Sequence, residues 1–222
     1  MTNEGKSGAS DPPAEPNGAI LWDQRLARLM VRPLIDSSVT PNQITTVRLL
    51  TGLAACALIA WGGDRSWLNW GAALFIFSNL LDHADGELAR LTGKSSPFGH
   101  YFDLASDALI HALFFSALGF AVAGGRIGDW AIVLGTVATC GIGTLFWVFS
   151  HRMKLYGKAE LQPRWAGFEL EDIMYLLAPV VWLGWELPLL VIAGVMSPIA
   201  ALALLWLHRR TLFSASRREG LS

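Results

Sequence analysis

The sequence predicts an all-α integral membrane protein with six transmembrane helices, an N-terminal amphipathic interfacial helix and both termini in the cytoplasm. Three observations favour this class. Of the 222 residues, 53% are hydrophobic and only 16% are charged, and the mean hydropathy is +0.41. Apolar runs recur at nearly membrane-spanning length, and Lys and Arg gather between alternate runs. So few charges could not cover a soluble surface, which argues against a soluble enzyme or a nucleic-acid binder.

The N-terminal 36 residues divide into two parts. Residues 1–19 are rich in Gly, Ser, Pro and Asn and lack an apolar core, so we expect a disordered tail rather than a signal peptide. Over residues 20–36, apolar side chains at helical spacing lie opposite a row of arginines: Trp22, Leu26, Leu29, Met30 and Leu34 against Arg25, Arg28 and Arg32. This pattern fits a helix on an anionic membrane surface and, nearly as well, an amphipathic helix packed on protein.

A six-helix transmembrane domain is predicted over residues 37–210, followed by a cytoplasmic tail over 211–222. It contains six apolar segments: Ile44–Trp61, Trp67–Leu91, Tyr101–Ala123, Trp130–Ser150, Ile173–Trp185 and Leu187–Leu207. The fifth segment is short, because its length gives a rise of only about 20 Å against a ~30 Å hydrocarbon core. It could begin earlier, near Glu169, or be re-entrant.

The positive charges predict the orientation. With the N-terminus inside, 15 of the 17 Lys and Arg residues fall on the inner side, and only Arg65 and Arg126 fall outside. Basic residues concentrate in cytoplasmic loops. An even number of crossings with both termini in the cytoplasm follows.

Four acidic residues interrupt the second and third apolar segments near their inner ends: Asp82, Asp85, Asp103 and Asp107. Bare carboxylates in spanning helices are costly, so we expect a cationic partner. The spacings of three and four residues place each pair on one face of its helix. Between the pairs, Gly93 can end one helix, Ser96 can cap the next and Pro97 fits its first turn.

A turn this short predicts two antiparallel neighbouring helices whose four carboxylates converge at the cytoplasmic end. Carboxylate oxygens suit hard divalent ions such as Mg²⁺ or Mn²⁺, and four of them can hold two ions. Zinc is disfavoured because no Cys or His stands at ligand spacing. His83 and His111 are interpreted as packing or hydrogen-bonding residues.

Small and basic residues accompany the acids. Gly86 and Gly99 lack side chains where a ligand could approach the backbone, and Arg90, one turn beyond Gly86, could clamp a phosphate. Each glycine alone is better explained by helix packing, because glycine is common in membrane helices. Together they predict a site for a phosphorylated, metal-chelating ligand.

The whole stretch reads Asp82-x-x-Asp85-Gly86-x-x-Ala89-Arg90, eight residues, then Gly99-x-x-x-Asp103-x-x-x-Asp107. It resembles the signature of the CDP-alcohol phosphotransferase (CDP-alcohol phosphatidyltransferase) family at every position and gap. The entry to the first segment, Thr40-Pro41-Asn42, and the six-helix plan resemble the family more loosely.

The resemblance implies a homodimeric membrane enzyme of phospholipid synthesis that transfers a phospho-alcohol from a CDP-linked lipid alcohol to a hydroxyl acceptor and releases CMP. It implies that Asp82, Asp85, Asp103 and Asp107 ligand two Mg²⁺ or Mn²⁺ ions, with Asp107 as the catalytic proton acceptor. It further implies that the CDP-alcohol site is shaped by Gly86, Ala89, Arg90 and Gly99, with Ser96 and Asn42 as additional contacts.

The acceptor is less constrained. A basic inner loop with Arg152, Lys154 and Arg164 could bind a phosphorylated acceptor, but inner loops are basic for topological reasons too. A divalent-cation transporter or channel is the competing class, because it also explains acidic residues within membrane helices. It does not explain the signature glycines and arginine. We expect a bacterial inner (cell) membrane location with the active site facing the cytoplasm.

Overall fold

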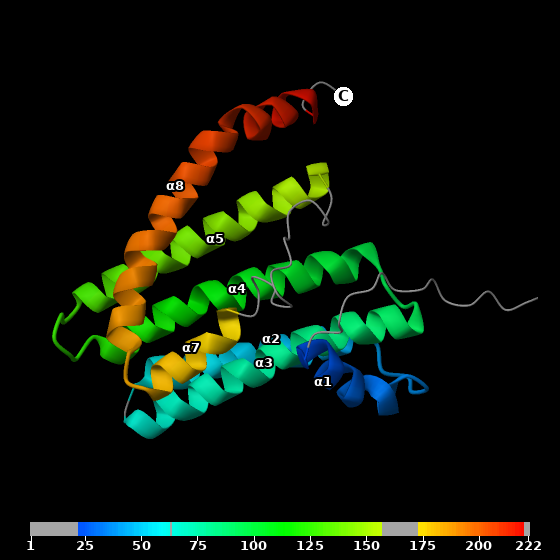
Figure 1. The fold of residues 1–222 in the computed structure, drawn as a ribbon, viewed down its shortest axis with the longest axis horizontal. Coiled ribbons are helices and arrows are strands. Elements are labelled where there is room, and N and C mark those ends of the chain that lie inside the picture. Colours follow the sequence, from blue (N-terminus) through cyan, green and yellow to red (C-terminus); the bar gives the residue numbers. More distant parts are fainter. Residues whose placement is uncertain (1–21, 63, 157–172, 220–222) are drawn as a thin grey trace, which may run out of the picture.

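The structure is a computed structural model that describes residues 22–62, 64–156 and 173–219. Within these ranges the regular elements are all helical (Figure 1): α1 (Trp22–Val31), the 3₁₀ helix η1 (Arg32–Leu34), α2 (Pro41–Trp61), α3 (Arg65–Thr92), α4 (Pro97–Val122), α5 (Trp130–Tyr156), α7 (Ile173–Trp182) and α8 (Glu186–Glu219). Each of the six predicted apolar segments therefore contains a helix. The predicted tail over 1–19 lies outside the described residues.

Helix α2 is central to the bundle, since it packs against both α3 and α4, while α5 packs between α4 and α8 and α7 packs on α3. The apolar core includes side chains from these contacts, among them Ile59 of α2, Phe75 of α3, and Phe114 and Leu118 of α4, all fully buried. Burial of large apolar side chains supplies the main favourable term in this packing.

Four of the described helices are long and apolar enough to cross a membrane: Pro41–Trp61, Pro97–Val122, Trp130–His151 and Glu186–Arg209. Helix α3 has 28 residues, but its second half carries the acidic and basic residues of the signature. Helix α7 has 10 residues and rises only about 15 Å, half of a hydrocarbon core. The predicted membrane class is thus supported by four candidate spanning helices among the described residues.

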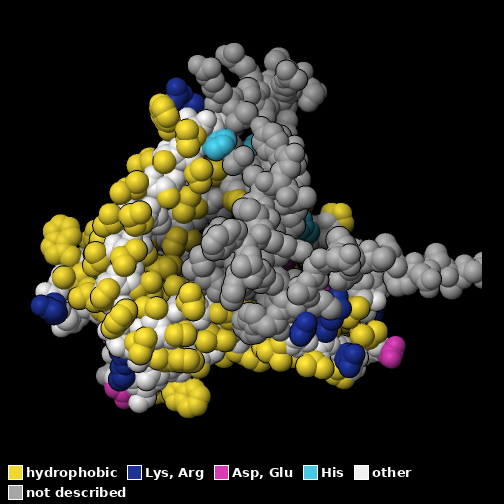
Figure 2. All heavy atoms as spheres, in the orientation of Figure 1, with side chains coloured by type: hydrophobic (Ala, Val, Ile, Leu, Met, Phe, Trp, Pro, Cys, Tyr) yellow, Lys and Arg dark blue, Asp and Glu magenta, His cyan; other side chains and the backbone are white. Residues whose placement is uncertain are grey.

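The two ends of the bundle differ in surface chemistry. Most of the exposed tryptophans gather at the end where α2 and α7 finish and α3, α5 and α8 begin: Trp61, Trp67, Trp70, Trp130, Trp182 and Trp185. Trp147 and Trp206, in the second halves of α5 and α8, are exposed as well. Tryptophan favours the level of the lipid headgroups. Arg90 and Lys94 lie at the opposite end, where α3 turns toward α4. In Figure 2 the described residues on the left of the view and along its lower edge are mostly hydrophobic, as expected for a surface in contact with lipid.

Helix α1 packs on protein along one face. Ala27 and Val31 are buried and belong to a cluster with Leu81, Ala84 and Leu88 of α3, whereas Leu29 on another face is 60% exposed. The predicted helix over 20–36 is thus a ten-residue α-helix followed by η1, docked beside the C-terminal half of α3. At the other terminus, α8 continues to Glu219, past the domain boundary predicted at 210.

Two glycines of α5 serve contacts within the chain. A Cβ on Gly135 would lie 2.6 Å from the carbonyl oxygen of Phe115 in α4, and one on Gly141 would clash with Ser197 and Pro198 of α8. Gly143 faces open space. Small residues here allow helices of one chain to approach closely.

Candidate functional site

The turn between α3 and α4 forms as its sequence predicts. Gly93 ends α3 in the left-handed conformation with φ of +65°, which glycine adopts without steric cost. The Ser96 hydroxyl accepts a hydrogen bond from the Gly99 backbone N–H at 3.0 Å, and Pro97 occupies the first helical position. Local capping therefore fixes where α4 begins, and with it the position of Asp103.

Three signature carboxylates converge. Asp82 and Asp85 from α3 and Asp103 from α4 each offer an oxygen within 4.8 Å of the others. Asp85 is buried, while Asp82 and Asp103 are partly exposed. An all-oxygen, all-anionic donor set of this kind suits a hard divalent cation.

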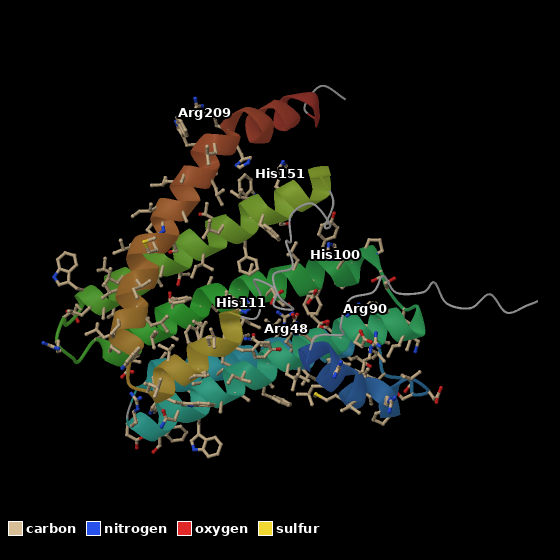
Figure 3. The ribbon with its side chains drawn as sticks, in the orientation of Figure 1. Arg48, Arg90, His100, His111, His151 and Arg209 are labelled. Carbon is tan, nitrogen blue, oxygen red and sulfur yellow. The ribbon has the colours of Figure 1, made fainter. Side chains whose placement is uncertain are left out.

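The fourth carboxylate joins the cluster through Arg48 of α2. This guanidinium is 1% exposed, and its Nη1 lies 2.7 Å from an oxygen of Asp82 and 2.7 Å from one of Asp103. Its Nη2 pairs with Asp107. In Figure 3, Arg48 lies in the interior of the bundle, and Arg90 lies at the end of α3. The cationic partner expected for the acids is thus a side chain of the same chain.

Helices α3 and α4 are neighbours, as the short turn predicts. The Phe75 ring of α3 lies 4.5 Å from the Phe114 ring of α4, centroid to centroid, and 5.8 Å from the His111 ring. Helix α2 packs more extensively on each of them than they pack on each other, and its Arg48 reaches carboxylates on both. Arg48 therefore adds a third helix to the site, which the hairpin alone did not predict.

Side chains beside the aspartates also form hydrogen bonds, and one of them orients Asp85. The Thr45 hydroxyl donates to Asp85 Oδ2 at 2.6 Å inside the protein. His111 lies one turn beyond Asp107, with its Nδ1 2.9 Å from the Asp107 carbonyl oxygen and its ring stacked on Phe146. His83 Nδ1 lies 3.2 Å from the Tyr175 hydroxyl. Both histidines pack and hydrogen-bond, as predicted.

A cavity of about 180 Å³ opens beside the carboxylates. It is lined by five of the residues assigned to the CDP-alcohol site, together with Asp85 and Asp103: Asn42, Gly86, Ala89, Ser96 and Gly99. The sequence thus brings the start of α2, the end of α3 and the start of α4 around one space.

The two signature glycines differ in their surroundings. A Cβ on Gly86 would meet nothing within 4 Å, so its backbone faces open space. A Cβ on Gly99 would lie 2.6 Å from Asn42 Oδ1 and 3.1 Å from Ser96 Oγ. Gly86 therefore keeps room for a ligand, whereas Gly99 makes room for protein atoms that line the cavity.

Arg90 is exposed and bound to Glu87, with its Nη2 2.9 Å from Glu87 Oε2. Arg90 is not among the residues that line the cavity. The predicted acceptor residues fall outside what the structure describes: Arg164 entirely, and Arg152 and Lys154 in their side chains.

Sequence reasoning missed Arg48, Thr45 and Glu87. Arg48 was counted only as one of the inner positive charges. Its signal was available, because a lone arginine inside an apolar segment needs a partner as much as the acids do. Thr45 carried no comparable signal, since threonine is common in apolar helices.

Fold and site together define a class: a helical membrane protein with a carboxylate cluster beside a cavity at one end of its bundle. The model of the family described as CDP-alcohol phosphatidyltransferase matches residues 38–207. The chain belongs to this family, as its signature predicted.

Individual relatives match over shorter stretches. A bifunctional IPC transferase and DIPP synthase of Rubrobacter xylanophilus is 34% identical over 85 residues, which cover 38% of this chain and 19% of that protein. A putative cardiolipin synthase of Mycobacterium tuberculosis is 35% identical over 69 residues, covering 31% of this chain and 32% of the other. The matches thus span about a fifth to a third of these curated relatives.

The fold is shared over most of the chain with a solved structure. The crystal structure of Mycobacterium tuberculosis phosphatidylinositol phosphate synthase (PgsA1) with CDP-DAG bound superposes with a TM-score of 0.61, 18% sequence identity, and coverage of 82% of this chain and 94% of that one. At this identity the likeness establishes the fold.

Proposed function

We propose that this protein is a phospholipid-synthesis enzyme that transfers a phosphatidyl group from CDP-diacylglycerol to a hydroxyl acceptor with release of CMP. The observation that carries the proposal is the convergence of Asp82, Asp85 and Asp103 beside a cavity lined by signature residues. Family membership supports the reaction class. The CDP-DAG bound to PgsA1, which has the same fold, supports the donor.

The proposed cofactors are two Mg²⁺ or Mn²⁺ ions, held by Asp82, Asp85, Asp103 and Asp107. When bound, such ions supply neutralisation of the donor diphosphate and polarisation of the phosphorus under attack. The donor set fits them because it is all oxygen. Asp85 and Asp103 also line the cavity, which supports access of an ion to their oxygens.

The chain's own residues would divide the remaining work. Gly86, Ala89 and Gly99 would shape the cytidine diphosphate site, with Asn42 and Ser96 as additional contacts, and Arg90 would bind a diphosphate oxygen bidentately. The acceptor oxygen forms a bond to the phosphatidyl phosphorus as the bond to the bridging oxygen breaks. CMP leaves with that electron pair.

Asp107 is proposed to take the proton of the acceptor hydroxyl on a carboxylate oxygen. A carboxylate is a weak base for an alcohol, so proton transfer must be coupled to formation of the new bond. The contact of Asp107 with Arg48 supports a fixed orientation of this carboxylate. Held in this way, it would face the acceptor rather than rotate freely.

The proposed membrane arrangement has six spans, with both termini and the active site on the cytoplasmic side of a bacterial inner membrane. Arg90 and Lys94, at the end of α3 beside the turn, support this orientation because basic residues favour the cytoplasmic side. We propose a homodimer because the family resemblance implies one.

The acceptor is proposed to be a phosphorylated alcohol bound by Arg152, Lys154 and Arg164. A screen of purified protein with CDP-diacylglycerol tests this, with glycerol 3-phosphate, inositol phosphate, serine, choline and a sphingoid base as acceptors. We expect CMP release to be fastest with a phosphorylated acceptor. Fastest release with serine, choline or the sphingoid base would contradict the acceptor assignment and leave the donor assignment standing.

A divalent-cation channel explains the site less well. Arg48 is buried among the carboxylates that a permeating cation would have to pass, and a fixed positive charge opposes such passage. Flux of Mn²⁺ into liposomes that contain the protein, without CMP release, would favour the channel instead.

A further inference from the structure

Glu87 occupies an unassigned position within the signature stretch. It follows Gly86 on α3 and precedes Arg90 by one helical turn. The residue is 1% exposed, which is unusual for a glutamate, because a buried carboxylate requires close cationic partners.

Two arginines supply those partners from different elements. Oε2 binds Nη2 of Arg90 at 2.9 Å on the same helix, and Oε1 binds Nε of Arg28 on α1. Arg28 is about one-third exposed and Arg90 more than half exposed, whereas the carboxylate between them is buried. Glu87 is therefore a bridge between α1 and the arginine assigned to the donor diphosphate.

The bridge lies within an apolar contact that fixes α1. Ala27 and Val31 lie on either side of Arg28 along the chain, and both are buried in one cluster with Leu88 of α3. Arg28 thus meets Glu87 within the docked face of α1. Movement of α1 would break the ion pair and the apolar contact together.

An exposed arginine has many rotamers, and ordering it when a ligand binds costs affinity. Glu87 engages one edge of the Arg90 guanidinium. A guanidinium carries five N–H donors, so the group keeps donors for a phosphate. Arg28 in turn holds the Glu87 carboxylate against α1, which restrains both oxygens.

We propose that Glu87 and Arg28 are positioning residues that pre-order Arg90 for the diphosphate of a CDP-linked lipid, so that docking of α1 sets donor affinity. The inference rests on the proposed function for the identity of the ligand. It predicts an effect on donor binding and not on the chemical step.

The test measures transfer kinetics and direct CDP-diacylglycerol binding in proteoliposomes for Glu87→Gln and Arg28→Gln. Both variants are expected to raise the donor KM and Kd about tenfold, with kcat within about twofold of the wild type. Arg25→Gln is the matched control, because Arg25 is an exposed arginine one turn earlier on α1. It removes the same charge from the membrane surface and should leave KM unchanged.

A double variant separates positioning from general damage. If Glu87 acts through Arg90, Glu87→Gln adds no further rise in KM or Kd once Arg90 is replaced by Lys. The inference would be overturned if Glu87→Gln and Arg90→Lys raised the donor KM and Kd additively. It would also be overturned if Glu87→Gln lowered only kcat, or if Arg25→Gln raised the donor KM as much as Arg28→Gln does. If Glu87→Gln does not fold, the donor KM and Kd of Arg28→Gln test the inference instead, because Arg28 is partly exposed.

Binding of CDP-diacylglycerol without turnover in the wild type would refute the proposed reaction. The inference would then still be tested by the Kd values of the variants.

Discussion

The Thr45 hydroxyl donates a 2.6 Å hydrogen bond to the buried Asp85 carboxylate and so links α2 to the acidic face of α3. With Arg48 one turn further along α2, it makes this helix the support for carboxylates carried by α3 and α4. Metal ligands depend on such supporting contacts for orientation. Helix α2 therefore takes a direct part in building the site.

Replacing Thr45 by Val should weaken metal-dependent activity while keeping the volume of the side chain. The Mg²⁺ concentration for half-maximal transfer is expected to rise about tenfold or more, because Asp85 loses its orienting donor. Thr46→Val is the matched control, since Thr46 is exposed and bonds only the Asn42 carbonyl oxygen of its own helix among the contacts described. Equal metal titrations for wild type and Thr45→Val would contradict this role.

Replacing Arg48 by Gln should destabilise the metal-free protein. Loss of one partner from a buried charge cluster costs about 3 to 5 kcal/mol, so the melting temperature in EDTA should fall by several degrees. Added Mg²⁺ should then raise the melting temperature of the variant more than that of the wild type, because the carboxylates lack their internal cation. If the Arg48→Gln variant melts at the same temperature as the wild type in EDTA, Arg48 is not the cation that stabilises the carboxylate cluster.

The two signature glycines should respond differently to alanine. Gly86→Ala should keep the wild-type melting temperature, since its Cβ meets nothing, yet lower transfer about tenfold by filling space kept for the donor. Gly99→Ala should lower both the melting temperature and the rate of transfer, because its Cβ would collide with Asn42. Gly143→Ala, which also faces open space but on α5, serves as the control. Full activity of Gly86→Ala would show that the space is not used.

Asp107→Asn should abolish transfer while leaving folded protein in the membrane. The amide keeps the size of the side chain but cannot accept the proton of the acceptor hydroxyl. The readout is CMP release together with the elution profile of the purified protein. Substantial retained turnover would rule out Asp107 as the proton acceptor.

The parts of the site that sequence predicted are those set by local rules. Gly93, Ser96 and Pro97 define a helix end and a helix start through their own backbone preferences. The three- and four-residue spacing of the aspartates likewise fixes their helix faces. These rules act within a few residues and can be read without knowing the tertiary packing.

The parts that escaped prediction depend on which helix lies between which others. Placement of α2 against both α3 and α4 put Arg48 among the acids, which the turn between α3 and α4 does not predict. The collision of a Gly99 side chain with Asn42 and the burial of Glu87 by α1 are also tertiary facts. The apolar patterns of α2 and α1 do not encode which neighbours they meet.

The central claim is that the carboxylate cluster activates a CDP-linked lipid, and metal-dependent CMP release tests it most directly. Purified wild-type protein and Asp85→Asn would be compared with CDP-diacylglycerol and the acceptor panel, with Mg²⁺ and with EDTA. We expect the wild type to release CMP with Mg²⁺ and to release none in EDTA. We expect Asp85→Asn to release CMP at least about a hundredfold more slowly, which is the loss of rate typical when one stabilising polar group is removed from an active site. Equal release by Asp85→Asn, or no release by the wild type from CDP-diacylglycerol, CDP-choline or CDP-ethanolamine, would contradict it.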